Sequence, residues 1–68
     1  MIISNVRMES AAGFYLGSIE FIGQEAQPYD RDSMYYPSEE LLHNDYANSI
    51  SLKEAFEKGE AYNRLRRK

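Results

Sequence analysis

Two stretches near the start of the chain alternate hydrophobic and polar residues with the two-residue period of a β-strand. In the first, Ile2–Met8, this alternation places Ile2, Val6 and Met8 on one face. The second, Phe14–Ile22, is the strongest strand pattern in the chain. The short segment between them ends in a glycine, which can adopt a positive φ, so the pattern predicts an antiparallel hairpin.

The second strand is hydrophobic on both faces in its first half. Its second half alternates cleanly with Ile19 facing inward, and continuing this phase backwards places Tyr15 inside. Phe14 and Leu16 then face outward. Either Gly17 is a β-bulge that changes the facing, or Phe14 and Leu16 are covered by a helix or by a partner chain. A bulge or a cover within the chain is the favoured explanation.

The next ten residues, Gly23–Asp32, predict a loop. Pro28 biases the residue before it towards an extended conformation, and the aspartates near the end of the segment support turns. The aromatic stretch Ser33–Tyr36 follows, and its residue types favour a short third strand.

A short helix is predicted to begin within Pro37–Glu40. Ser38 is a good N-cap, and the two glutamates after it lie in the first turn, where the helix dipole favours anions. The hydrophobic side of this helix consists of Leu41, Leu42 and Tyr46.

A second, longer helix begins with the capping box Ser51–Glu54, in which the serine and glutamate side chains bond each other's backbone N–H groups. Gly59 near its middle either allows close packing against the sheet or weakens the helix. The helix carries a hydrophobic stripe at 3.6-residue spacing: Leu52, Ala55, Phe56, Gly59 and Tyr62.

The order of these elements predicts an α+β fold. A small antiparallel sheet of two or three strands packs with one short helix and one longer C-terminal helix, which cover one of its faces. At 68 residues the chain is expected to form a single small domain, residues 1–68, with a basic tail over residues 62–68.

The composition limits both the core and the cellular compartment. The chain has no cysteine, which excludes disulfides and thiolate zinc sites. Its hydrophobic runs are too short to span a membrane and its first residues lack a signal-peptide pattern, so we expect a cytoplasmic protein. A core this small contributes only ~3–5 kcal/mol. Either the caps and hairpins are well formed, or the chain also buries surface in an oligomer or complex.

Charge is unevenly distributed along the chain. Residues 1–61 hold all 11 acids and four of the 8 bases, which gives −7, and residues 62–68 hold the other four bases, which gives +4. These four are Arg64, Arg66, Arg67 and Lys68. The favoured explanation is compensation of the dipole at a helix C-terminus, and the alternative is contact with phosphate or an acidic surface. The acidic body disfavours general binding along nucleic acid.

Catalytic chemistry has little support in the sequence. His43 is the one histidine, too few for a metal cluster, and is expected to be a half-exposed surface residue. Nucleotide-binding, metalloprotease and serine-hydrolase motifs are absent. The acids around Asp30 and Asp32 lack the spacing of a calcium loop. We therefore expect no enzyme activity, no cofactor and no metal.

Tyrosine is the residue type that stands out. Tyrosines gather between residues 29 and 36 beside an arginine, and both types are enriched at energetically important positions of protein interfaces. One of two neighbouring tyrosines in a strand faces the core while the other faces outward. The candidate partner-binding residues are Tyr29, Asp30, Arg31, Tyr35 and Tyr36.

The strand Gly13–Gly17 and the segment Pro28–Glu40 together resemble small uncharacterised proteins of phages and prophages. Those proteins combine an aromatic strand with a glycine, a proline–tyrosine–x–arginine loop, and a tyrosine pair that precedes a capped helix. The resemblance covers about residues 13–42 and carries no active-site residues. It implies an accessory or host-interaction factor, a class that includes inhibitors of bacterial defence systems.

Three hypotheses follow. The first is a non-enzymatic protein-binding module, in one form a phage-type inhibitor of a host defence protein. The second is a nucleic-acid-associated regulator that uses the basic tail; its reverse, an acidic surface that imitates nucleic acid, ranks below protein binding. The third is a homo-oligomeric structural protein with Phe14 and Leu16 in the contact.

Overall fold

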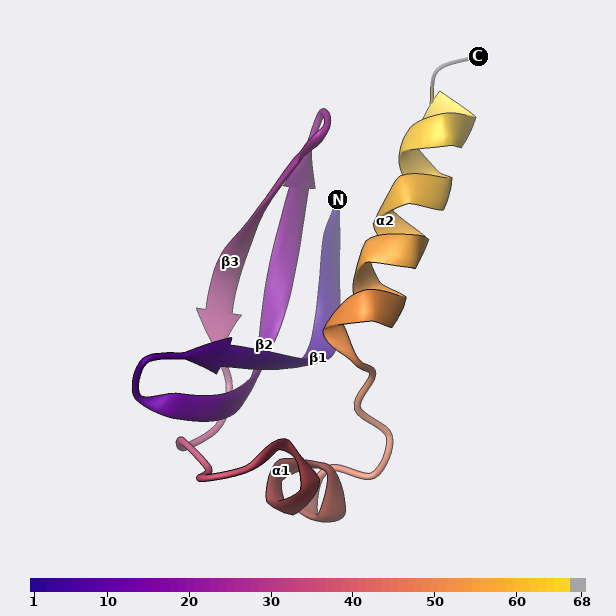
Figure 1. Ribbon diagram of the computed structural model, residues 1–68. Helices are drawn as coiled ribbons and strands as arrows, with labels where there is room; N and C mark the ends of the chain where they lie inside the picture. Colours follow the sequence, from indigo (N-terminus) through magenta and orange to yellow (C-terminus); the bar gives the residue numbers. More distant parts are fainter. Residues whose placement is uncertain (67–68) are drawn as a thin grey trace.

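The computed structural model describes the backbone of residues 1–66 and the side chains of residues 1–60. A three-stranded antiparallel sheet in the order β1-β2-β3 is followed by two helices, which confirms the predicted α+β fold (Figure 1). The elements are β1 (Ile2–Ser10), β2 (Gly13–Ile22), β3 (Glu25–Arg31), α1 (Glu39–Asp45) and α2 (Leu52–Arg66).

Both hairpins have two-residue turns. The first joins Ser10 to Gly13, as predicted, and Gly13 has a φ of 134° that a larger residue would adopt only with strain. The second was not predicted: Ile22 pairs with Glu25, and Gly23 between them has a φ of 62°. A glycine at the first central position is typical of a type II′ hairpin turn.

Two predictions about the segment after β2 are therefore wrong. Most of the predicted loop Gly23–Asp32 forms β3, because Pro28 is tolerated in a strand at the edge of a sheet. The predicted third strand Ser33–Tyr36 is reduced to one isolated bridge between Tyr36 and Phe14.

The sheet turns sharply part-way along, so that the hairpin end of β1 and β2 points away from the rest (Figure 1). One extra residue lies in β1 between Ile3 and Val6, where Asn5 has a φ of 66°. Another extra residue, Tyr29, lies in β3. Both bulges lie beside Ser18 of β2, and bulges bend strands and increase their twist. Gly17 is paired with Val6 on one side and with Arg31 on the other. Gly17 is thus not itself the bulged residue.

The bulge in β1 corrects one prediction about the core. Ile3 is buried and Ile2 is exposed, because the extra residue shifts the alternation before Val6. Val6 and Met8 are buried as expected. With these residues, the main core consists of Tyr15, Ile19, Phe21 and Ala55.

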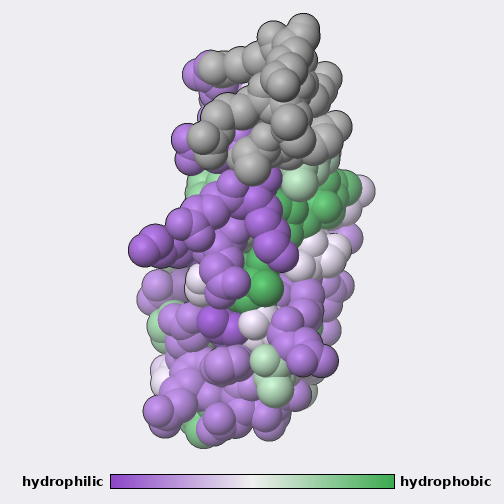
Figure 2. Space-filling view, turned by 90° about the vertical axis from the view of Figure 1, so that its right-hand side faces the viewer, coloured by the Kyte–Doolittle hydropathy of each residue, from purple (hydrophilic) through white to green (hydrophobic). Residues whose placement is uncertain are grey.

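Helix α2 packs closely on the core face of the sheet. Ala55 is fully buried, and a Cβ built at Gly59 would lie 2.6 Å from atoms of the Phe21 ring. Gly59 therefore serves close packing, which is one of the two roles predicted for it. From the side of α2 the surface is mainly hydrophilic, with hydrophobic residues gathered in its middle (Figure 2).

Helix α1 packs on the opposite face, so the prediction that both helices cover one face is wrong. Arg7 and Leu16 are cross-strand neighbours on the face opposite Tyr15, and Arg7 contacts α1 through Glu39. Leu16 and Leu42 are buried here, while Leu41 is exposed. The cover over Leu16 thus comes from within the chain.

Candidate functional site

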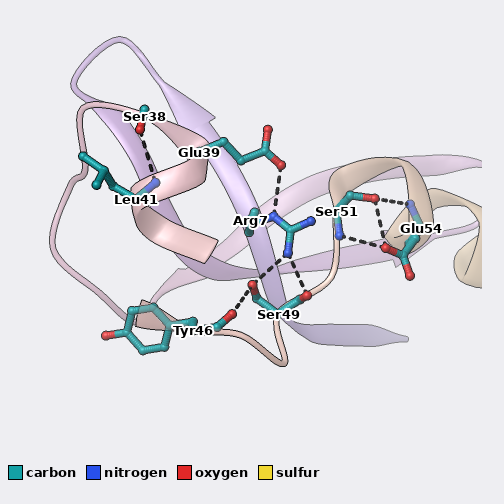
Figure 3. Close-up of polar contacts among 8 residues, drawn as sticks. All are labelled: Arg7, Ser38, Glu39, Leu41, Tyr46, Ser49, Ser51 and Glu54. Carbon is teal, nitrogen blue, oxygen red and sulfur yellow. Dashed lines mark hydrogen bonds and ion pairs between the residues drawn. The ribbon is translucent and has the colours of Figure 1, made fainter. Parts of the chain in front are cut away.

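Arg7 holds α1 and the segment that follows it against the middle of β1 (Figure 3). Its Nε donates to Glu39 Oε2 at 3.0 Å, and one terminal nitrogen donates to the carbonyl of Ser49 at 2.7 Å and to its hydroxyl at 2.9 Å. The Ser49 hydroxyl in turn donates to the carbonyl of Tyr46. A planar guanidinium can satisfy several acceptors at once. The Arg7 side chain therefore joins β1 both to α1 and to the segment around Ser49.

Caps formed by nearby side chains stabilise the first turns of α1 and α2 (Figure 3). Ser38 Oγ accepts the backbone N–H of Leu41, as predicted for an N-cap. Ser51 and Glu54 form the predicted capping box: Ser51 Oγ accepts the N–H of Glu54 at 3.1 Å, and Glu54 Oε1 accepts the N–H of Ser51. These caps satisfy N–H groups that a helix start otherwise leaves unpaired.

The segment between β3 and α1 is attached to β2 at both ends. The N–H of Asp32 donates to the carbonyl of Leu16, and the N–H of Leu16 donates to Ser33 Oγ. Tyr36 and Phe14 exchange both backbone hydrogen bonds, at 2.6 and 2.9 Å. Five residues, 32–36, thus run beside three residues of β2, 14–16, and the surplus residues are pushed outward from the sheet.

This outward segment displays hydrophobic side chains. Met34 is 79% exposed, the highest value among the exposed large hydrophobic residues described, and Tyr35 is 44% exposed. Met34 was not among the candidate residues, because a strand over residues 33–36 does not predict a protruding loop. A flexible thioether suits an adaptable binding surface.

Tyr35 is held in place although it is exposed. The Arg31 guanidinium lies 4.7 Å from the centre of the Tyr35 ring, and the ring meets Tyr15 edge-to-face at 5.6 Å. Arg31 also donates to the carbonyl of Ser33 at 3.1 Å. Both side chains are therefore ordered before any partner arrives, which lowers the entropy lost on binding.

Tyr36 faces inward by comparison and is bound within the chain. Its hydroxyl donates to Asp45 Oδ2 at 2.6 Å, and its ring meets Tyr46 edge-to-face. The hydrogen bond to the Asp45 carboxylate is the main cause that raises the pKa of Tyr36 to about 12. Tyr36 thus joins α1 to the sheet, and Tyr35 is the tyrosine of the pair that stays exposed.

The remaining candidate residues lie apart from this cluster in different ways. Tyr29, the bulged residue of β3, is 52% exposed, and Asp30 is exposed opposite Ser18. The backbone of Arg64 and Arg66 lies in α2. The last two candidates, Arg67 and Lys68, lie outside the described residues.

The described part of the chain holds no group of three or more metal-ligating side chains, and none of its helices has the length and hydrophobicity of a membrane span. His43 is exposed on α1.

Comparison with protein-family models, curated proteins and solved structures finds no match for this chain.

Proposed function

We propose that this protein acts by binding another protein, without catalysis, through the surface formed by Arg31, Met34 and Tyr35. The observation that carries the proposal is the outward segment between Asp32 and Tyr36, which is hydrogen-bonded to β2 at both ends. It presents Met34 and Tyr35 to solvent on a rigid support. Monomeric proteins that expose such groups in clusters commonly use them for recognition.

The chemistry of this surface also supports protein recognition. Tyrosine and arginine are enriched among the residues that dominate interface energetics, because each buries a large area and still forms polar contacts. Asp30 and Asp32 flank Arg31, so the surroundings of the surface are acidic. Acidic surroundings would speed association with a basic partner.

The resemblance of residues 13–42 to small phage and prophage proteins suggests a finer form of the proposal. In that form the partner is a host protein in the cytoplasm, and binding inhibits a defence function. The proposal of a protein partner stands without this finer form.

The test uses tagged protein to capture partners from a lysate of the natural host, followed by calorimetry with the purified partner. We expect Arg31→Ser with Tyr35→Ser to weaken the partner's Kd by a factor of 100 or more, since residues of this type contribute about 2 kcal/mol or more each. Tyr36→Phe is the matched control and keeps wild-type affinity. Unchanged binding by the double variant would remove this surface from the proposal.

A nucleic-acid-associated function is the second candidate, favoured by the four bases in the last seven residues. Titration of labelled DNA and RNA at two salt concentrations tests it. Phosphate contacts would give binding that weakens steeply with salt. Failure to bind at low salt excludes it.

A further inference from the structure

A groove of about 490 Å³ lies between α2 and β3 on the core face of the sheet. Leu52 and Phe56 of α2 line one side of it, Ala26 and Pro28 of β3 line the other, and Ile19 lies at its floor. Among the described residues that line it, Glu9 is the only charged one. The groove is thus largely apolar.

The groove exists because α2 covers only part of the core face. Cross-strand pairing puts Ala26 beside Phe21 and Pro28 beside Ile19, so both β3 residues face the core side. Phe21 and Ile19 are buried, whereas Ala26 is half-buried and Pro28 is exposed. The surface over β3 therefore lacks the cover that α2 gives to β1 and β2.

We propose that the groove is filled by α2 of a second copy of this chain, in an antiparallel, two-fold symmetric pair. Helix α2 forms one wall of the groove and also carries the side chains that would enter the groove of the other copy. These are Leu52, which is 37% exposed, and Phe56, which is 45% exposed. A two-fold axis beside Phe56 places the Phe56 of each copy in the groove of the other. Such a contact is self-complementary and closes at two copies.

Charge complementarity along α2 supports a second copy as the occupant. Successive residues of an α-helix are 100° apart around its axis. Going around α2 from the edge of its buried face, the side chains therefore come in the order Leu52, Phe56, Glu60 and Lys53. Antiparallel pairing about a point next to Phe56 places Lys53 of one copy opposite Glu60 of the other, twice by symmetry. The polar border of the contact is thus attractive although the chain as a whole is acidic.

The contact is separate from the surface assigned to partner binding. It differs also from a dimer through Phe14 and Leu16, because Leu16 is buried within the chain. Burying Leu52, Phe56 and the groove would extend a core that is small for an independent domain.

Sedimentation equilibrium of the full chain over about 10 µM to 1 mM tests the proposal, a range that detects dissociation constants of micromolar to millimolar size. We expect the average mass to rise from that of one chain towards that of two. A mass that stays at one chain up to the highest concentration overturns the proposal.

Three charge variants test the arrangement without disturbing buried groups. We expect Lys53→Glu to raise the dimer dissociation constant on the order of tenfold, since two exposed pairs become repulsive. Lys53→Glu with Glu60→Lys restores wild-type dimerisation. Lys58→Glu, the matched control on the other side of α2, makes the same change in net charge and leaves dimerisation unchanged. Equal weakening by Lys53→Glu and Lys58→Glu, or no restoration by the double variant, overturns it.

Discussion

The two faces of the sheet are closed in different ways. On the α1 face, a short helix is fixed by directional contacts: the hydrogen bonds of Arg7, the Tyr36–Asp45 bond and the buried Leu42. On the α2 face, a helix of 15 residues packs mainly through close hydrophobic contact at Ala55 and Gly59. The shorter helix closes its face at Leu16, whereas the longer one leaves a groove beside β3.

The difference shows that helix length does not decide how well a sheet is covered. Directional polar contacts fix where α1 lies relative to β1 and β2, so few residues suffice. Apolar packing at Gly59 brings α2 close to Phe21, but one helix covers only a limited width of a sheet. The α1 face should therefore be sensitive to single side chains, and the α2 face should be more tolerant.

Leu42→Ala tests the α1 face most severely. Leu42 is fully buried, and its truncation leaves a cavity, so we expect a loss of about 3 kcal/mol in the free energy of unfolding. That loss is most of the stability of a domain this small. Urea denaturation followed by circular dichroism measures it. The neighbouring Leu41→Ala is the matched control, since Leu41 is 46% exposed, and equal losses would contradict the assigned packing.

Arg7→Ala removes the side-chain contacts that join β1 to Glu39 of α1 and to Ser49. We expect a loss of about 2 kcal/mol, because the carbonyl of Ser49 loses a charged donor in a partly buried site. Arg7→Lys should recover only part of this, since an ammonium lacks the planar fork. Arg31→Ala, at an exposed arginine, serves as the control in the same denaturation series. A loss as large at Arg31 would show that the Arg7 contacts have no special role.

Gly59→Ala tests the close contact on the α2 face through the sign of its effect. Helix propensity alone predicts stabilisation of about 1 kcal/mol. The new methyl group would instead meet the Phe21 ring, and we expect a net destabilisation of about 1 kcal/mol. Thermal unfolding of Gly59→Ala measures the change in stability. Glu57→Ala, at an exposed position two residues earlier in α2, is the control. A rise in Tm would mean that α2 stands further from the sheet.

The fold could be predicted from the sequence where the contacts that determine it are local. Ser38 and the Ser51–Glu54 box predicted both helix starts, because caps depend on residues three apart. The alternation in β1 failed at Ile2, since a bulge at Asn5 shifts every residue before it. β3 was missed because Pro28 argues against a strand until its edge position is known.

The candidate surface was predictable only in part for a similar reason. Adjacent tyrosines were expected to face different ways, and Tyr35 is exposed while Tyr36 is bonded to Asp45. Which of the two is exposed depends on hydrogen bonds between the segment and β2, far away in the sequence. The exposure of Met34 follows from the same contacts.

Tyr36→Phe has the smallest expected effect and is measured by pH. The Asp45 hydrogen bond raises the pKa of Tyr36 from 10.0 to about 12 in the folded state. The stabilising contribution of the phenol is therefore complete below pH 10 and is lost as the pH rises towards 12. Ultraviolet titration of the wild type should show a late ionisation that belongs to Tyr36. That late step should be absent in Tyr36→Phe and should come earlier in Asp45→Asn; its persistence in Tyr36→Phe would contradict the assignment.

Pro28 in β3 has a consequence for how the protein avoids fibrous aggregation. An exposed strand edge is a template on which further strands can add without limit. At Pro28 the outward backbone nitrogen has no hydrogen to donate, and the bulge at Tyr29 interrupts the pairing beside it. A strand from another molecule therefore finds no continuous row of donors and acceptors along the β3 edge of this sheet.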